Sequence, residues 1–366
     1  MAVKLFTPLD LGGITLPNRI VISPMCQYSA DDGSMNDWHL VHLGHLSYSG
    51  AGLMILEATH VTREGRITHN CAGLYSEHNE AAMKRVIDVC RRLSKNPIAV
   101  QLAHAGRKAS SQVPWEGREW LREDQSPWRT VAPSAIAYGE GWHVPYEMTT
   151  AEIRGVVDAF AASAERAKRI GFDAVELHSA HGYLLHQFLS PLSNQRRDSY
   201  GKNRMQFPLE VARAVREVWP RERALGARIS ANDWMPGGLG PDDAVAYARE
   251  LERIGLDYVC ASSGALVPQA RIPLGPGYQV PFAEKIKQAA GIKVQAVGMI
   301  ADPRQAEDIL MSGKADMVVM ARAFLDNPRW VWHAAEQFGV ALDYPPQYAR
   351  SRHDLWPGAK IARPAG

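Results

Sequence analysis

The stretch Arg169-Ile-Gly-Phe-Asp-Ala-Val175 contains a helix end, a glycine and the start of an apolar strand. It recurs as Arg253-Ile-Gly-Leu-Asp-Tyr-Val259, and Ser312-Gly-Lys-Ala-Asp-Met-Val318 is a looser third copy. In each copy glycine stands where helices commonly end, and an acidic residue precedes the strand. A repeated junction between helix, glycine and strand predicts serial β/α units along the chain.

Outward from these junctions, eight short apolar runs have the length and composition of buried parallel strands. They are Arg19–Met25, Leu53–Ala58, Pro97–Leu102, Asp173–Leu177, Leu225–Ser230, Tyr258–Ser262, Val294–Val297 and Met317–Met320. Helix-patterned stretches separate the runs, and no Gly-x-Gly-x-x-Gly fingerprint follows an early strand. The sequence therefore predicts an α/β fold of the (β/α)8 barrel type, the TIM barrel, rather than a doubly wound sheet.

Two of the intervening helices have clear sequence signals. A capping box at Thr149-Thr-Ala-Glu152 begins one helix, which should end near Gly171. Residues 77–93 form another helical pattern, and its inward face is expected to contain Ala81, Val86, Val89 and Leu93.

Two segments depart from the repeat. Residues 104–148, after the third strand, lack periodicity and carry several tryptophans among prolines and glycines. Long irregular segments in compact domains are usually functional, so we expect a lid or hairpin over one barrel mouth, with a decorative insertion as the alternative. The pattern dissolves after Phe338, so residues 340–366 should form an extended C-terminal tail. No linker is evident, and residues 1–366 are expected to be a single domain.

Composition limits the classes of partner. The formal net charge is +2 with both signs spread along the chain, which provides neither a basic stripe for nucleic acid nor a polybasic membrane segment. No apolar run approaches the length of a membrane span or signal peptide, so we expect a cytoplasmic protein acting on small molecules. The four cysteines lack the close pairing of a zinc or iron–sulfur site and are expected to be reduced.

In a barrel of this type the reacting groups lie at the C-terminal ends of the strands. Those ends contain no cluster of acidic residues, so we expect no metal site. Arg322 and Gly298 match the usual phosphate site after the last two strands, with a surface salt bridge as the alternative for the arginine. Arg228 lies within an apolar strand, where a guanidinium requires an anionic or polar partner. The full set of strand ends is Pro24-Met25-Cys26, Ala58, Gln101, His178, Arg228, Ser262, Gly298 and Arg322.

The segment His178-Ser-Ala-His181-Gly-Tyr183 follows the fourth strand directly. Two imidazoles and a phenol at this spacing can present hydrogen-bond donors and a proton to one oxygen-bearing substrate. Histidines at strand ends are also often bonded only to backbone, and from these six residues alone a structural role is the alternative.

Several motifs, in order, resemble the Old Yellow Enzyme family. They are Asn18-Arg-Ile-Val-Ile-Ser-Pro-Met-Cys-Gln-Tyr28, Gln101-Leu-Ala-His-Ala-Gly-Arg-Lys108, His178-x-x-His181-x-Tyr183, Ala296-Val-Gly298 and Ala321-Arg322. The cysteine in the first motif and the run Ser262-Ser-Gly-Ala-Leu-Val267 resemble the thermophilic-like bacterial ene-reductases of that family, the NADPH dehydrogenase or xenobiotic reductase type. The resemblance covers essentially the whole chain, and ordered motifs are more specific than any one alone.

This resemblance implies non-covalent FMN, reduced by NADPH or NADH, which delivers hydride to the β-carbon of an α,β-unsaturated carbonyl compound. It implies that His178 and His181 bind the carbonyl oxygen and that Tyr183 protonates the α-carbon. Residues implied around the flavin ring are Ser23, Pro24, Met25, Cys26, Ala58, Gln101 and Arg228. Those implied at its phosphate are Gly298, Ala321 and Arg322.

Three further roles come from the resemblance. Cys26 would contact the flavin and tune its reduction potential, although a lone cysteine is otherwise usually a packed residue. Tyr28 would offer its hydroxyl to the substrate, with a simple loop aromatic as the alternative. Arg350 would enter the site of a neighbouring subunit, which implies a homo-dimer or homo-tetramer. The rival from a different class is a catalytically silent flavin- or phosphate-binding barrel that acts through partners.

Overall fold

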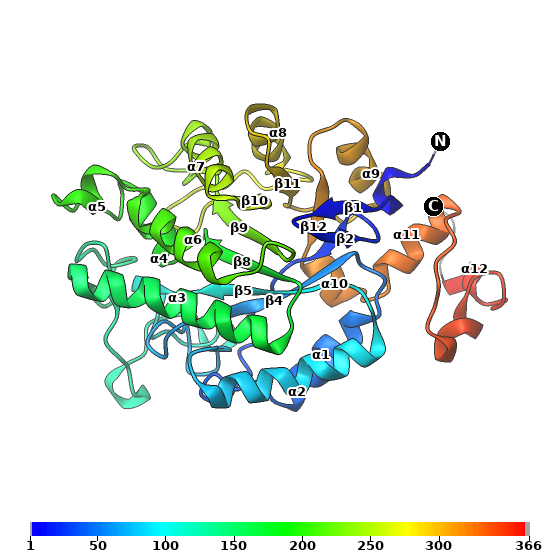
Figure 1. The fold of residues 1–366 in the computed structure, drawn as a ribbon, viewed down its shortest axis with the longest axis horizontal. Helices are drawn as coiled ribbons and strands as arrows, with labels where there is room; N and C mark the ends of the chain where they lie inside the picture. The colour runs from blue at the N-terminus through cyan, green and yellow to red at the C-terminus, as the bar shows by residue number, and fades with distance from the viewer. Residues whose placement is uncertain (1, 363–366) are drawn as a thin grey trace.

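The computed structural model describes residues 2–362 and contains a closed barrel of eight parallel strands (Figure 1). The strands follow each other around the barrel in the order β10-β11-β12-β3-β4-β5-β8-β9. Their bounds are β3 (Ile20–Ile22), β4 (Leu53–His60), β5 (Ile98–Ala103), β8 (Ala174–Ser179), β9 (Ala224–Ser230), β10 (Tyr258–Ser262), β11 (Lys293–Ala296) and β12 (Met317–Met320). Each predicted apolar run overlaps one of these strands, so the (β/α)8 fold is confirmed.

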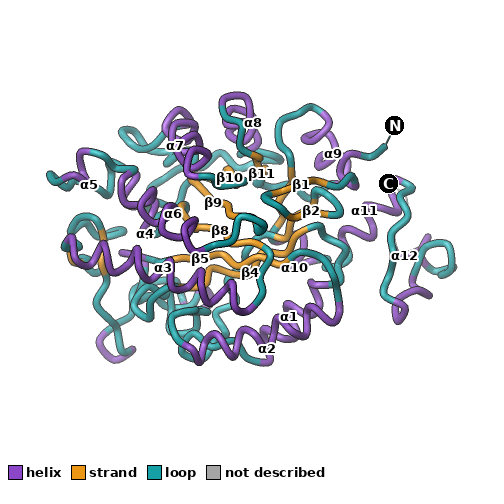
Figure 2. Tube along the Cα trace, in the orientation of Figure 1, coloured by secondary structure: helices purple, strands orange, loops and turns teal. Residues whose placement is uncertain are grey.

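Helices ring the strands, as Figure 2 shows, and cover the outer face of the barrel. Those between strands are α1 (Asp37–Ser47), α2 (Glu77–Leu93), α3 (Thr150–Ile170), α6 (Gln206–Val218), α7 (Pro241–Ile254), α8 (Val280–Ala289) and α9 (Pro303–Met311). The short α4 (Leu184–Leu189) and α5 (Ser199–Lys202) precede α6. After β12 come α10 (Arg322–Asp326), α11 (Trp330–Phe338) and α12 (Ala359–Ala362).

Helix ends follow local sequence signals better than helix faces do. The capping box between Thr149 and Glu152 forms at the start of α3, and Gly171 ends that helix with φ of +97°. The predicted inward face of α2 is wrong at Ala81 and Leu93, which are exposed, whereas Val86 is buried and Val89 is half-buried. The buried stripe instead contains Asn79, Met83, Val86, Ile87 and Cys90, which recur at helical spacing.

A β-hairpin that the sequence analysis missed closes the N-terminal end of the barrel. β1 (Leu9–Leu11) and β2 (Ile14–Leu16) pair antiparallel around Gly12-Gly13, whose φ values are +53° and +82°. Leucines of the hairpin pack against Leu53, Ala174 and Met317, the first residues of three barrel strands. This end of the barrel is therefore packed with apolar side chains, and the strand ends that carry the predicted site lie at the opposite end.

The segment 104–148 runs beside that open end. It contains the 3-10 helices η2 (Gly106–Lys108), η3 (Pro114–Glu116) and η4 (Glu123–Gln125), and two short strands, β6 (Val131–Ala132) and β7 (Tyr146–Glu147). β6 and β7 pair parallel, so they do not form a hairpin with each other. Trp115 packs edge-on against Tyr28, with ring centroids 6.0 Å apart. A lid role for this segment and the single-domain assignment stay predictions.

The C-terminal tail extends beyond α11 at the edge of the molecule (Figure 1). The tail contains the 3-10 helix η5 (Pro346–Ser351), and residues 363–366 of the predicted tail lie outside the described residues. Tyr348 contacts Tyr48 of the α1 end, with their hydroxyls 3.2 Å apart, and the Arg329 guanidinium lies over both rings. Within residues 2–362, no helix combines the length and apolarity needed to cross a bilayer.

Candidate active site

The predicted motif forms one cluster of rings at the end of β8. The His178 ring meets those of His181 and Tyr183 edge-on, with centroids 5.1 Å and 4.9 Å away. His178 is still within β8, whereas Tyr183 stands just before α4. The intervening turn therefore folds the three side chains together at the mouth of the barrel.

His178 is a neutral hydrogen-bond donor. Burial lowers its pKa well below the ordinary value, and the charge of Arg228, its register partner on β9, lowers it further. Its Nδ1 accepts the Ala180 N–H at 3.3 Å. Because a neutral imidazole carries one proton, that proton is on Nε2.

His181 is also neutral, because burial, followed by the charge of Arg228, lowers its pKa well below the ordinary value. Its Nε2 lies 2.7 Å from Oγ of Ser262, at the end of β10. Its backbone N–H donates to Oγ of Ser230 at 3.0 Å, and its φ is +57°. Two neighbouring strand ends thus hold this residue in a left-handed conformation that non-glycine residues rarely adopt.

Tyr183 retains its phenolic proton at neutral pH. Burial raises its pKa well above 10, and the nearby Cys26 and Tyr28 raise it further. The side chains of Tyr183, Cys26 and Tyr28 all pack against one small apolar cluster that contains Cys71. The structure therefore brings the loop after β3, predicted to lie at the flavin, next to the predicted proton donor.

Cys26 has no features of a nucleophile. Burial raises the pKa of its thiol well above 9, and the Glu57 carboxylate raises it further. The thiolate is the reactive form of cysteine, so this side chain remains an unreactive thiol at neutral pH. Its predicted flavin-tuning role stays a prediction.

Two of the predicted flavin residues are linked across the barrel by hydrogen bonds. Nη1 of Arg228 donates to Oγ of Ser23 at 2.6 Å and joins β9 to the end of β3. Gln101 donates to Oε1 of Glu176 at 2.7 Å. A β-bulge between Leu56 and Ala58 sets Ala58 opposite Gln101, an arrangement often found beside active sites.

The predicted phosphate residues lie near the same mouth. Burial raises the pKa of Tyr278, and the positive charges of Arg322 and Arg228 oppose that rise, so Tyr278 is within electrostatic reach of both arginines. Gly298 has φ of +120°, and a Cβ there would lie 3.1 Å from the Tyr278 ring. The Arg322 side chain is exposed, and its guanidinium forms no ion pair or hydrogen bond within residues 2–362. The surface salt bridge that was the alternative role for this arginine is therefore not present there.

Arg350 is not brought to this cluster. It lies in η5, on the tail that packs against α1 and α11, and its side chain is exposed. Its predicted entry into a neighbouring subunit's site therefore stays a prediction.

Three functional neighbours were missed in the sequence, namely Lys108, Glu176 and the pair of His186 with Asp233. The only signal for Lys108 was its place at the end of the Gln101 motif, directly after a strand. Glu176 occupies an inward strand position, and a buried acidic residue within an apolar run could have marked it.

Lys108 lies beneath the cluster. Nζ donates to the carbonyls of His181 and Ala265 at 2.9 Å and 3.0 Å, and lies 5.0 Å from the centre of the Tyr183 ring. Burial, followed by the charges of Arg107 and Arg118, lowers its pKa from 10.5 to about 7. A lysine with this pKa titrates in the physiological range.

This pKa predicts a pH-dependent stability. Below about pH 7 Lys108 is protonated in the folded and unfolded chains alike, but between about 7 and 10.5 only the unfolded chain keeps the proton. Stability therefore rises with pH in that window, by up to about 1.4 kcal/mol per pH unit. Chemical unfolding from pH 6 to 9 should show this rise in the wild type and its absence in Lys108→Met. Parallel curves for the two proteins would contradict the assignment.

Comparison with known proteins agrees with this geometry. The family model described as NADH:flavin oxidoreductase / NADH oxidase matches residues 4–339. The chain belongs to this family. It is 45% identical over 355 residues to an NADPH dehydrogenase of Geobacillus thermodenitrificans, covering 96% of this chain and 99% of that protein. It is 41% identical over 353 residues to an NADPH dehydrogenase of Listeria innocua, covering 95% and 99%.

Solved structures of this family have the same barrel. Morphinone reductase in complex with tetrahydroNAD superposes with a TM-score of 0.74 at 31% identity, covering 94% of this chain and 93% of that one. A structure titled TcOYE with pHBA gives 0.76 at 26% identity, covering 97% and 99%. The resemblance to the Old Yellow Enzyme family is confirmed, and the chain is an NAD(P)H-dependent flavin oxidoreductase with FMN as its cofactor.

The residues at the barrel mouth fit FMN. This cofactor has a planar ring with polar edges and an anionic phosphate. The buried Nε of Arg228 has no hydrogen-bond partner in the described part of the chain, and it offers a donor to a ring edge. Arg322 offers a guanidinium not engaged by another residue of 2–362. A polar ring edge would accept a hydrogen bond from Nε of Arg228, and an anionic phosphate would pair with the guanidinium of Arg322.

Proposed function

We propose that this enzyme reduces the activated C=C bond of α,β-unsaturated carbonyl compounds. The observation that carries the proposal is the ring cluster at the end of β8, where a neutral imidazole with a proton on Nε2 meets a phenol that retains its proton. An enone matches these two groups, because its carbonyl oxygen can accept a hydrogen bond and its α-carbon, close by, can accept a proton. The supporting comparisons concern the flavin chemistry rather than this substrate.

Bound and reduced, FMN supplies a hydride for the β-carbon of the alkene. Nε2–H of His178 donates to the carbonyl oxygen. His181 donates to the same oxygen after its Nε2 leaves Oγ of Ser262. These donors stabilise the negative charge that develops on the oxygen. Tyr183 then gives its proton to the α-carbon. Tyr28 offers its hydroxyl to the substrate from the loop after β3.

The FMN ring is held in this proposal by residues from four strand ends. They are Ser23, Pro24, Met25, Cys26, Ala58, Gln101 and Arg228. The phosphate is held by Gly298, Ala321 and Arg322. The contacts between Arg228 and Ser23 and between Gln101 and Glu176 support this assignment because they preorganise polar groups at one mouth.

The phosphate assignment predicts that Arg322→Ala weakens FMN binding. Loss of one charge-assisted contact should raise the Kd for FMN about tenfold or more, and the loss should shrink at high salt. Arg213→Ala, on the outer face of α6, is the matched control because it also removes an exposed arginine. Equal FMN affinity in all three proteins, measured by flavin fluorescence, would argue against a phosphate at Arg322.

The substrate class is tested by turnover of an enone panel with NADPH and with NADH. We expect saturated carbonyl products from enones and no reduction of isolated alkenes, because only a conjugated carbonyl can use the donors at His178 and His181. Turnover of none of the enones by the FMN-loaded enzyme would contradict the proposal.

A further inference from the structure

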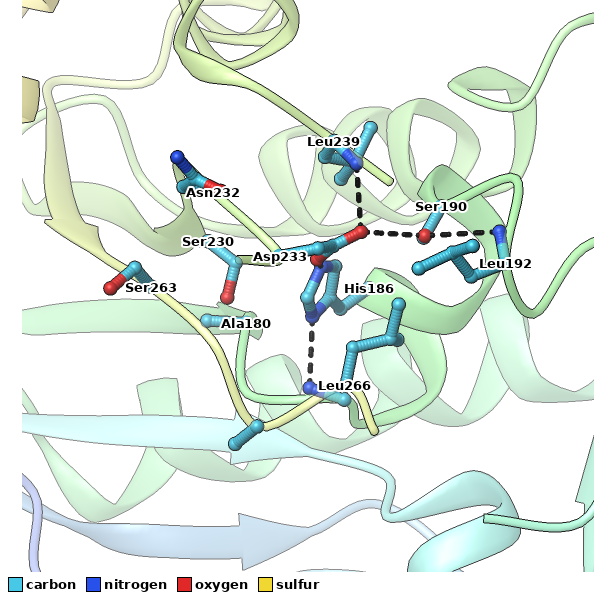
Figure 3. Close-up of polar contacts among 12 residues, drawn as sticks. Ala180, His186, Ser190, Leu192, Ser230, Asn232, Asp233, Leu239, Ser263 and Leu266 are labelled. Atoms are coloured by element: carbon cyan, nitrogen blue, oxygen red, sulfur yellow. Dashed lines mark hydrogen bonds and ion pairs between the residues drawn. The ribbon is translucent and has the colours of Figure 1, made fainter. Parts of the chain in front are cut away.

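A buried histidine–aspartate pair lies directly behind the ring cluster and has no part in the proposed chemistry. Nε2 of His186, in α4, lies 2.9 Å from Oδ1 of Asp233, in the loop after β9, and both side chains are fully buried. The other Asp233 oxygen accepts from Oγ of Ser190 at 2.7 Å and from the Leu239 N–H at 2.8 Å. Figure 3 shows these bonds meeting at Asp233. One carboxylate oxygen of Asp233 is thus held by two hydrogen bonds, and the other lies at ion-pair distance from the His186 ring.

The backbone sets the position of the proton on this pair. Nδ1 of His186 accepts the Gly182 N–H at 2.8 Å, so the ring proton is on Nε2, which faces Asp233. Burial raises the pKa of Asp233, but its bonds from His186, Leu239 and Ser190 outweigh burial and leave the pKa below its ordinary value. Asp233 is therefore a carboxylate that selects the tautomer of His186 able to accept from Gly182.

The Gly182 peptide is the link between two reacting side chains. His181 and Gly182 have φ values of +57° and +73°, two consecutive left-handed residues. A Cβ at Gly182 would lie 2.3 Å from the Ala265 carbonyl oxygen, so the turn also packs tightly against the loop after β10. An unfavourable turn of this kind persists only where its surroundings hold it.

Each peptide group of the turn is in fact held. The His181 N–H donates to Ser230, and the His181 carbonyl accepts from Lys108. The Gly182 N–H donates to His186. Without its acceptor at His186, this last N–H would be buried and unpaired, and the bond from Lys108 to the His181 carbonyl would hold this peptide at one side only.

We propose that His186 and Asp233 are positioning residues for the alkene-reduction step. His186 fixes the Gly182 peptide and so orients His181 and Tyr183, and Asp233 fixes the tautomer of His186. The inference rests on the proposed roles of His181 and Tyr183. Neither His186 nor Asp233 touches the substrate.

Two variants of His186 separate positioning from simple stability. In His186→Asn the amide oxygen takes the place of Nδ1 and can accept from Gly182, but the side chain no longer reaches Asp233. In His186→Gln the side chain reaches Asp233 and leaves Gly182 without an acceptor. Both variants remove the same buried ring, so their losses of stability should be similar.

We expect His186→Gln to slow reoxidation of the reduced flavin by 2-cyclohexenone about tenfold or more beyond His186→Asn, because small misplacements of reacting groups are costly. Reduction of the flavin by NADPH should differ little between the two. The measurement is stopped-flow absorbance on each FMN-loaded, full-length variant. Equal slowing of reoxidation by both variants would overturn the positioning role.

Hydrogen exchange of residues 180–184 provides a readout that does not depend on the reaction. Exchange should be faster in His186→Gln than in His186→Asn, because only the first leaves the Gly182 N–H unbonded. Equal exchange would show that His186 does not hold the turn. A protein with this exchange difference but no enone reduction would refute the proposed function and not the bond to Gly182.

Discussion

Replacing Tyr183 by phenylalanine should leave flavin reduction by NADPH nearly intact and slow alkene reduction by about 10²- to 10⁴-fold, the usual contribution of a positioned general acid. The phenol retains its proton at neutral pH because burial raises its pKa. Phenylalanine keeps the ring that packs against His178 and Lys108 and removes only the hydroxyl group that carries the proton. Stopped-flow spectroscopy of the two half-reactions measures both effects in one protein.

Tyr200→Phe is the matched control for this experiment. Tyr200 is also buried, and its hydroxyl bonds to Glu210 in α6, away from the ring cluster. Its loss should slow neither half-reaction selectively. If Tyr183→Phe slowed flavin reduction and alkene reduction equally, Tyr183 would not be the proton donor.

Replacing His178 by alanine should lower kcat/KM for an enone by about 10²- to 10³-fold, the effect of losing one oxyanion donor. Alanine removes the Nε2–H of His178. This donor is available for a substrate oxygen because Nδ1 accepts the Ala180 N–H and the ring proton is on Nε2. FMN content should stay unchanged, because the ring is held by other residues. Steady-state kinetics at matched FMN occupancy measures this loss.

His45→Ala, which removes an exposed imidazole from α1, should leave kcat/KM unchanged. A His178→Ala enzyme that reduced enones within a few-fold of the wild type would show that the carbonyl oxygen is stabilised elsewhere.

The barrel could be predicted because its strands are buried on both faces and therefore stand out as apolar runs. The N-terminal hairpin was missed although Gly12-Gly13 between alternating residues is a usual hairpin signal. Its apolar residues alternate over only three residues on each side, too few for a periodic pattern to be recognised. The inward face of α2 was misassigned because Ala81 and Leu93 are apolar yet exposed, and apolar residues are common on protein surfaces.

The site could be predicted only where its residues share a motif or a strand end. His178, His181 and Tyr183 lie within six residues, and the barrel rule placed Arg228 and Gln101 at the same mouth. The pair of His186 and Asp233 is separated by 47 positions along the chain, and nothing in either neighbourhood marks the contact. Lys108 was visible in a motif, but its lowered pKa depends on burial that only the folded chain creates.

We expect the flavin of this barrel to carry hydride from a nicotinamide to an activated alkene. An anaerobic titration tests it most directly: NADPH is added to the FMN-loaded enzyme, followed by 2-cyclohexenone, while the flavin absorbance is recorded. We predict that NADPH bleaches the yellow flavin and that 2-cyclohexenone restores the colour. A bound flavin that responds to neither reagent would contradict this account and favour a catalytically silent flavin-binding barrel.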